Sequence, residues 1–222
     1  MAIEFEGRVL DINYDDFVSK IKLVGGKIKK PLMLYKRSVF SLCDIKRGFV
    51  RVRDEGDRVM MTAKQYKDVK FPEEYELEIK DTFGNGEAFL QALGLNKKAY
   101  HETMRETWSI PLSKTSKTEL CEIALDFIPA LPLYAELECK TKAHLDRSVK
   151  LLGIPLSSLM YGGYGKVFTH YYGMPENDIN NVIPSITFEN ITKELKPYIR
   201  KNNVLLDTVA KSHLTIYKSV KK

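Results

Sequence analysis

Charged side chains alternate with apolar ones at the very start of the sequence. Glu4, Glu6 and Arg8 fall on alternate positions, and Phe5 lies between the two acids. In a β-strand, residues i and i+2 share one face and lie about 6.6 Å apart. Such a face presents two carboxylates, which suit a divalent cation, and a guanidinium, which suits an anion such as phosphate. A strand that only faces water can show the same alternation, so the rest of the chain must decide.

Several later stretches repeat the alternation, and most carry charges of one sign. The acidic positions are Glu74, Glu76 and Glu78, then Glu122 and Asp126, then Glu136 and Glu138. The basic positions are Arg51 and Arg53, then Lys64, then Arg105. A solvent-exposed face is the simpler interpretation of any one strand, but such a face usually mixes both signs. We therefore expect the polar faces to point into a closed barrel, where strands of opposite charge offset each other's burial.

The composition is that of a folded protein with some preference for anionic partners. The chain has 222 residues, of which 44% are hydrophobic, and its net charge is +6. No apolar run approaches the roughly 18 residues that cross a membrane, and the first residues do not resemble a signal peptide. The three cysteines, Cys43, Cys121 and Cys139, lack metal-binding spacing. We expect them to be reduced thiols in a cytoplasmic protein.

The predicted elements define an α+β protein. Period-two stretches predict strands over residues 2–10, 31–42, 48–56, 57–66, 73–81, 100–111, 118–129 and 131–141. Helical spacing of apolar residues predicts helices over 14–26, 86–95, 143–153 and 188–202, with Pro197 ending or kinking the last one. Residues 161–181, rich in Gly, Tyr and Asn, are expected to form an ordered loop. We expect an antiparallel barrel over residues 1–155 and a C-terminal extension of unassigned role over 156–222.

The order of these motifs resembles the signature of the CYTH, or triphosphate tunnel metalloenzyme, superfamily. Its members include class IV adenylyl cyclases, thiamine triphosphatases and inorganic tripolyphosphatases. The resemblance covers roughly residues 2–153, and the order and spacing of the motifs are more specific than any one of them. The matching set is Glu4, Glu6 and Arg8; Arg51 and Arg53; Lys64; Glu76 and Glu78; Arg105; Asp126; Glu136 and Glu138. It implies an eight-stranded antiparallel β tunnel with a charged interior and helices packed outside.

The resemblance also implies roles for these residues. The implied ligands of Mg²⁺ or Mn²⁺ are Glu4, Glu6, Glu76, Glu136 and Glu138, with Glu74 or Glu78 left open beside Glu76. The implied triphosphate-binding residues are Arg51, Arg53, Lys64 and Arg105, and the implied catalytic residues are Arg8 and Asp126. Two positions depart from the family pattern. Arg8 replaces a lysine and cannot act as a neutral amine, and Tyr35 is followed by the cations Lys36 and Arg37 where an acid is usual.

The favoured function is metal-dependent hydrolysis of a triphosphate-containing small molecule, either inorganic triphosphate or a nucleoside or thiamine triphosphate. Two alternatives remain open. A class IV-type adenylyl cyclase would use the same charges to make cyclic AMP and pyrophosphate from ATP. A non-catalytic protein would bind a phosphorylated ligand or an RNA 5′ end, with the basic C-terminus touching nucleic acid. No membrane partner is expected, and a homodimer is left open. The Gly-rich residues 162–166 lack the spacing of a phosphate-binding P-loop and are expected to be a plain loop.

Overall fold

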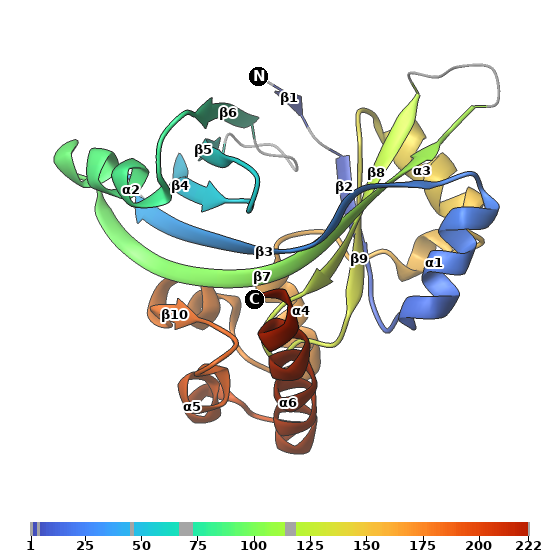
Figure 1. Ribbon diagram of the computed structural model, residues 1–222. Helices are drawn as coiled ribbons and strands as arrows, with labels where there is room; N and C mark the ends of the chain where they lie inside the picture. The colour runs from blue at the N-terminus through green and yellow to red at the C-terminus, as the bar shows by residue number, and fades with distance from the viewer. Residues whose placement is uncertain (1, 4, 45–46, 67–72, 114–118, 222) are drawn as a thin grey trace.

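The protein is built on one strongly curved β-sheet, with helices on its outer face and a helical C-terminal segment below it (Figure 1). The structure, a computed structural model, describes residues 2–3, 5–44, 47–66, 73–113 and 119–221. None of the described helices is both long and apolar enough to cross a lipid bilayer.

The sheet follows a single path of hydrogen-bonded strands. Its strands are β1 (Ala2–Ile3), β2 (Phe5–Val9), β3 (Lys27–Ser41), β4 (Gly48–Asp54), β5 (Val59–Gln65), β6 (Glu73–Ile79), β7 (Asn96–Pro111), β8 (Leu120–Phe127), β9 (Tyr134–Cys139) and β10 (Ser185–Ile186). The order along the path is β1-β6-β5-β4-β3-β7-β8-β9-β2, and every pair on it is antiparallel. β10 pairs with β7 in parallel, outside this path.

The N-terminal segment touches both edges of the sheet. β1 pairs with β6, whereas β2 pairs with β9 at the other end of the path. The predicted first strand is therefore split in two, and counting its halves as one gives the predicted eight strands on the antiparallel path, with β10 in addition. The α+β tunnel fold is confirmed, with one correction. Hydrogen bonds do not close the sheet, because β2 and β6 do not pair with each other in the described part of the chain.

β3 and β7 are the longest strands, and both begin earlier than the sequence predicts. Their pairing runs from Lys27 opposite Ser109 to Ser41 opposite Asn96, with three register irregularities along the way. The polar residues that begin each strand suggest a loop, but cross-strand hydrogen bonding extends the ladder over them. The long, curved pair joins the two halves of the sheet (Figure 1).

Three helices cover the outer face of the sheet. They are α1 (Tyr14–Leu23), α2 (Phe83–Ala92) and α3 (Lys142–Leu151). Each begins at a residue whose side chain accepts a hydrogen bond from a first-turn N–H: Asn13, Thr82 and Thr141. The apolar side of each helix meets the outward apolar residues of the strands. The polar residues of the strands consequently face inward, as the alternation predicts.

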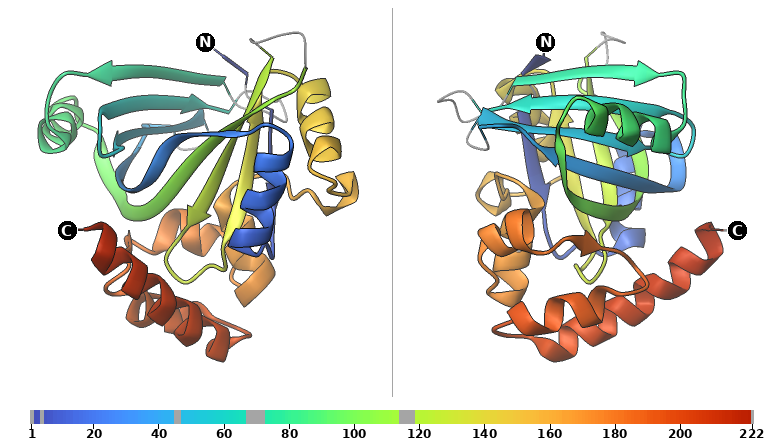
Figure 2. Two further views of the ribbon diagram at one scale, coloured as in Figure 1. Left: turned by 45° about the vertical axis from the view of Figure 1, so that its right-hand side comes forward. Right: turned by 90° about the vertical axis from the view of Figure 1, so that its left-hand side faces the viewer.

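The C-terminal segment folds beneath the sheet (Figure 2). It contains η2 (Leu156–Ser158), α4 (Tyr164–Tyr172), η3 (Asp178–Val182), α5 (Ile191–Leu195), η4 (Lys196–Tyr198) and α6 (Asn203–Val220). The expected loop over 161–181 is therefore wrong. Val167, Phe168, Tyr171 and Tyr172 are buried at helical spacing on α4, a pattern masked by the Gly-rich composition. The predicted helix over 188–202 is present only as α5 and η4, with Pro197 inside η4.

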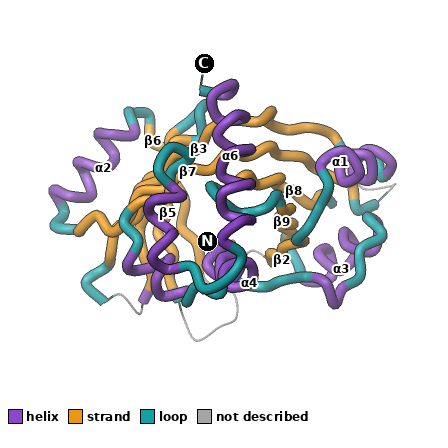
Figure 3. The backbone as a smooth tube through the Cα atoms, turned by 90° about the horizontal axis from the view of Figure 1, so that it is seen from below, coloured by secondary structure: helices purple, strands orange, loops and turns teal. Residues whose placement is uncertain are grey.

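Viewed from below, α6 crosses the sheet under β3 and β7 (Figure 3). Tyr217 on α6 is buried against Phe188, and both belong to one apolar cluster with Met104 of β7 and Phe127 of β8. A second cluster joins α4, α5 and α6 to the turn between β8 and β9. The C-terminal segment is thereby attached to the sheet through apolar contacts at two places.

The cysteine prediction is wrong for two of the three thiols. Cys121 and Cys139 lie directly opposite each other on β8 and β9, with Cα atoms 4.8 Å apart, and form a disulfide. Spacing along the sequence could not reveal this pair, because the register of the two strands brings the residues together. Cys43 is a free, exposed thiol.

Candidate functional site

A cavity of about 960 Å³ lies inside the curve of the sheet and is lined by the inward faces of its strands. Ten of the residues predicted from the sequence line it: Glu6, Arg8, Arg51, Arg53, Lys64, Glu76, Arg105, Asp126, Glu136 and Glu138. Glu4, the remaining predicted metal ligand, lies outside the described residues. Of the two alternatives beside Glu76, Glu74 lines the cavity, whereas Glu78 is exposed and does not. The structure thus brings the charged motifs into one space.

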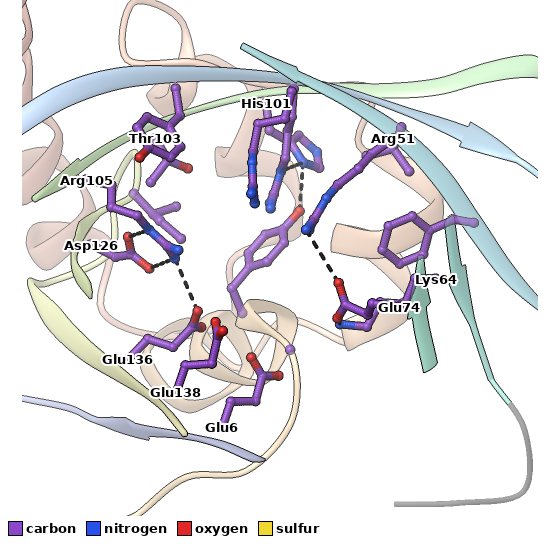
Figure 4. Close-up of a pocket in the computed structure, with 18 of the residues that line it drawn as sticks. Glu6, Arg51, Lys64, Glu74, His101, Thr103, Arg105, Asp126, Glu136 and Glu138 are labelled. Atoms are coloured by element: carbon purple, nitrogen blue, oxygen red, sulfur yellow. Dashed lines mark hydrogen bonds and ion pairs between the residues drawn. The ribbon is translucent and has the colours of Figure 1, made fainter. Parts of the chain in front are cut away.

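Acidic residues gather on one side of the cavity, where β2 pairs with β9. The register places Glu6 opposite Glu138 and Arg8 opposite Glu136. The three glutamates lie near one another in Figure 4. The buried Arg8 guanidinium donates to Glu136 and to the Gly162 carbonyl, and it lies 3.5 Å from Glu6. One guanidinium is therefore shared between two carboxylates.

Arg105 is held on the same side by two fixed acids. Its Nε and one terminal nitrogen donate to the two oxygens of Asp126, both at 2.6 Å, and that nitrogen also lies 3.2 Å from Glu136. This bidentate fork is the geometry that orients a guanidinium most firmly. Asp126 is only 1% exposed, so it serves as an anchor for Arg105.

The carboxylates on this side differ in how readily they bind a proton. Burial alone would raise the pKa of Glu136, but Arg8 and Arg105 outweigh it and lower the pKa to about 2. Burial and the neighbouring charge of Glu136 instead raise the pKa of Glu6. Glu6 therefore binds a proton more readily than Glu136, whose negative charge is neutralised by its two arginines.

Basic residues gather on the opposite side, on β4 and β5 (Figure 4). Arg51 lies 3.6 Å from Glu74 and 3.4 Å from Glu76, and Lys64 pairs with Glu74. Burial, followed by the neighbouring Arg53, lowers the pKa of Arg51 to about 10. Burial is the larger cause and the neighbouring positive charge the smaller one, and a bound anion would offset both by stabilising the protonated form.

The arginines also have unused hydrogen-bond donors. The Nε atoms of Arg8, Arg51 and Arg53 are buried and have no acceptor among the described residues. Buried donors are normally paired. An excess of donors over acceptors is expected of a cavity that receives an anion with many oxygens.

Several cavity residues were missed by the sequence analysis. Glu55, in the turn after β4, lies 2.5 Å from Arg53 and also pairs with Lys30 and Arg58. Burial would raise the pKa of Glu55, but these three cations lower it to about 2. An acid in a hairpin turn gives no signal in the sequence, since turns commonly carry exposed acids. Tyr134 is also buried beside the acidic side, and burial followed by Asp126 raises its pKa.

The C-terminal segment supplies part of the cavity wall. Met160 and Arg8 exchange two backbone hydrogen bonds along the edge of β2, each with an N–O distance of 2.9 Å. The chain then crosses to β7, where the Tyr164 hydroxyl lies 2.8 Å from Nδ1 of His101. The Gly-rich stretch expected to be a plain loop therefore borders the cavity, and its last three residues begin α4.

Glu6 and Glu138 are the residues best suited to hold a metal ion. Their carboxylates face the cavity from paired strands and are hard oxygen donors of the type that Mg²⁺ and Mn²⁺ prefer. Within the described residues, no group of three or more His, Cys, Asp or Glu side chains is gathered closely enough to hold an ion. The donors thus fit a cation that takes its remaining ligands from water and substrate phosphate.

No protein-family model and no curated relative matches this sequence. Solved structures do match its fold. A candidate adenylate cyclase from Vibrio parahaemolyticus aligns with a TM-score of 0.61 and 12% identity, over 76% of this chain and 98% of that one. The PH1012 protein from Pyrococcus horikoshii aligns with a TM-score of 0.55 and 19% identity, over 74% and 97% of the two chains. A conserved hypothetical protein from Pyrococcus furiosus gives 0.55 and 17%, over 72% and 97%. The resemblance inferred from the sequence is thereby confirmed for the fold.

Proposed function

We propose that the cavity binds a triphosphate-containing small molecule and hydrolyses it with the help of Mg²⁺ or Mn²⁺. The observation that carries this proposal is the division of charge inside one cavity. Acids on β2 and β9 lie across from the cations on β4 and β5. A phosphate chain with a bound cation presents both signs of charge and would satisfy both sides at once.

The arginines and Lys64 bind and orient the phosphate chain. Arg51, Arg53 and Lys64 approach it from β4 and β5, and Arg105 approaches it from β7. Guanidinium groups match two phosphate oxygens at a time, which fixes orientation as well as charge. Phosphoryl transfer depends mainly on such positioning and on stabilising developing negative charge.

Arg8 and Asp126 serve the reaction through charge and orientation. Burial disfavours the charged form of Arg8, but Glu136 and Glu6 outweigh it, so its pKa is raised. Arg8 therefore stays protonated and stabilises negative charge on phosphate. Asp126 aims the Arg105 fork, and Glu6 and Glu138, with Glu4 from the sequence pattern, would hold the metal. A metal held there would supply charge neutralisation for the phosphate chain and would make a nearby water more acidic.

Nucleotide cyclisation is the second candidate. Aromatic rings also border the cavity, among them Phe49 and Tyr66, whose centroids lie 6.3 Å apart. Such rings can stack on a nucleobase. The structural neighbour from Vibrio parahaemolyticus is itself described as a candidate adenylate cyclase. In that reaction the ribose 3′-oxygen attacks the α-phosphate and pyrophosphate leaves.

One assay separates the candidates. The protein is incubated with Mg²⁺ or Mn²⁺ and, in turn, with inorganic triphosphate, ATP, thiamine triphosphate and RNA bearing a 5′-triphosphate, and the products are quantified. We expect metal-dependent release of orthophosphate, reduced roughly 100-fold or more by Arg53→Ala or Glu136→Ala. Lys20→Ala, an exposed residue of α1, is the control and should leave the rate unchanged.

The other outcomes point elsewhere. Pyrophosphate and cyclic AMP without orthophosphate would establish the cyclase. Binding of any of these ligands without turnover, at every metal concentration, would establish a non-catalytic binding protein.

A further inference from the structure

Arg37 differs from the other arginines that line the cavity. Arg8, Arg51, Arg53 and Arg105 each form an ion pair with at least one carboxylate. Arg37 on β3 also lines the cavity, but no ion pair joins it to an acid of the described chain. Its charge is therefore not neutralised by a described carboxylate and is available to a ligand.

The position of Arg37 is fixed by the C-terminal segment. Its guanidinium carbon lies 4.6 Å from the centre of the Tyr164 ring, a cation–π contact. Its Nε lies 3.4 Å from Nδ1 of His101, the same atom that faces the Tyr164 hydroxyl at 2.8 Å. Because both neighbours are donors, Nδ1 acts as the acceptor and His101 is neutral. Burial, then Arg37 and Lys98, lowers the pKa of His101 well below its usual value.

A second cation reaches the same end of the cavity through an irregularity in β7. Val39 pairs with Ala99, but the next residue, Phe40, pairs with Lys97, so Lys98 is the extra residue of a β-bulge. Lys98 and Ala99 both line the cavity. In a regular strand two consecutive residues would face opposite sides, so the bulge is what turns Lys98 inward. No ion pair of the described residues involves Lys98, and burial lowers its pKa.

These two cations continue the basic side of the cavity. Arg37 lies directly opposite Arg53 in the pairing of β3 with β4, and it contributes to the lowered pKa of Arg51. The C-terminal segment borders this end with Tyr164, and its Asn180 and Glu176 also line the cavity. Glu176 is exposed, so solvent and salt screen its charge. Positive charge thus runs from β4 to the wall made by Tyr164.

We propose that Arg37, Lys98 and Tyr164 form an additional anion-binding subsite at this end of the cavity, which takes the terminal phosphate of a linear phosphate chain. This inference rests on the proposed function and names its substrate class. An inorganic chain is anionic at both ends, so one end occupies the subsite while the rest lies along Arg53 and Arg51. A nucleoside triphosphate whose reacting γ-phosphate lies on the acidic side, beside Glu6 and Glu138, places its uncharged nucleoside rather than a phosphate at the subsite. The substrate is therefore an inorganic polyphosphate of at least three units.

The test measures binding without metal, so that it does not depend on turnover. The affinities of inorganic triphosphate and ATP are determined by calorimetry in the presence of a chelator. We expect wild-type protein to bind triphosphate at least tenfold more tightly than ATP. Arg37→Gln should weaken triphosphate binding about tenfold and change ATP binding less than twofold. Lys98→Gln should also weaken triphosphate binding more than ATP binding, but its loss of triphosphate affinity should be smaller than that of Arg37→Gln.

Two variants separate charge from structure. Arg37→Lys keeps the charge but loses the planar stack on Tyr164, so its affinity for triphosphate should fall between those of wild type and Arg37→Gln. Lys97→Gln removes the adjacent lysine, which pairs with Glu87 and does not line the cavity; it should leave both affinities unchanged. Equal losses for triphosphate and ATP in Arg37→Gln would overturn the assignment of an inorganic substrate, and an unchanged affinity for triphosphate would overturn the subsite itself. So would a loss in Arg37→Lys as large as in Arg37→Gln at an unchanged melting temperature.

The two proposals can fail separately. Selective, Arg37-dependent binding of triphosphate without metal-dependent phosphate release would remove the hydrolase and leave the subsite intact. Phosphate release from triphosphate by wild type, with Arg37→Gln binding triphosphate as tightly as wild type, would remove the subsite and leave the hydrolase intact.

Discussion

The cavity and the core of the C-terminal segment bury opposite kinds of residue. The cavity holds charged groups in shared pairs, such as Arg8 between Glu6 and Glu136. The C-terminal core holds apolar side chains of α4, α5 and α6, including Phe168 and Leu206, which are fully buried. Burying charge costs free energy even when the charges are paired, whereas burying apolar surface supplies it. We therefore expect the C-terminal segment to contribute much of the stability, whereas the cavity is where we propose that the ligand binds.

The two regions are nevertheless joined. The segment that begins the C-terminal core also bridges Arg8 through Met160 and contacts Arg37 through Tyr164. A rigid apolar core can hold such residues in place against the cavity. The predictions below test how far the division between the two regions extends.

The largest effect is expected from breaking a pair inside the cavity. Arg105→Ala leaves Asp126, which is 1% exposed, without its bidentate partner and should lower the free energy of unfolding by about 3–5 kcal/mol. The double variant Arg105→Ala/Asp126→Ala should lose less than the single one, since no buried charge is left alone. Urea denaturation measures both. A double variant that is less stable than Arg105→Ala would show that Asp126 stabilises the fold even without its partner, which would contradict the expected cost of an unpaired buried charge.

A cavity in the C-terminal core comes next. Leu206 on α6 is fully buried, and Leu206→Ala should lower the free energy of unfolding by about 3 kcal/mol. Because its side chain does not line the charged cavity, the folded variant should bind inorganic triphosphate with wild-type affinity. Denaturation and calorimetry at a temperature where the variant is folded test both parts. A tenfold loss of affinity would mean that the two regions are not separable.

Acid should weaken the attachment of α6 to the sheet. Burial lowers the pKa of His213 from 6.5 to about 4, although its Nδ1 faces the Ile128 carbonyl at 3.1 Å. The unfolded chain takes up this proton below pH 6.5 and the folded chain only near pH 4, so the stability is present above pH 6.5 and is lost as pH falls toward 4. Between pH 7 and pH 5 the loss is about 2 kcal/mol. His213→Asn should show a correspondingly smaller loss over this range, and an unchanged pH dependence would contradict the assignment.

The smallest effect is expected outside both regions. Lys142 and Asp146 form an exposed pair one turn apart on α3. Lys142→Ala should change the free energy of unfolding by less than about 0.5 kcal/mol. The same denaturation experiment provides the baseline against which the other variants are compared, and a loss above 1 kcal/mol would show that surface charge is not neutral in this protein.

The sequence predicted the cavity better than it predicted the segment that borders it. Alternation fixes which side of each strand is polar, so residue order alone was enough to place Arg51, Arg53 and Glu136 on an inward face. The burial of Glu55 could not be predicted in this way, because it depends on a turn folding back onto Arg53. The helix at Tyr164 was missed because its apolar residues are interleaved with Gly and Tyr in a stretch that suggests a loop.

By itself, the sequence determined the strands, the inward charges and the resemblance to the tunnel metalloenzymes, because these depend on local period and on the order of residue types. Only the tertiary structure decided which charges meet. The register of β2 with β9 sets Arg8 against Glu136, and that of β8 with β9 joins Cys121 to Cys139. Likewise, only the path of the chain after Met160 brings Tyr164 to Arg37. Register and chain path are set by packing between segments that are distant in the sequence, so a local pattern of residues cannot predict them.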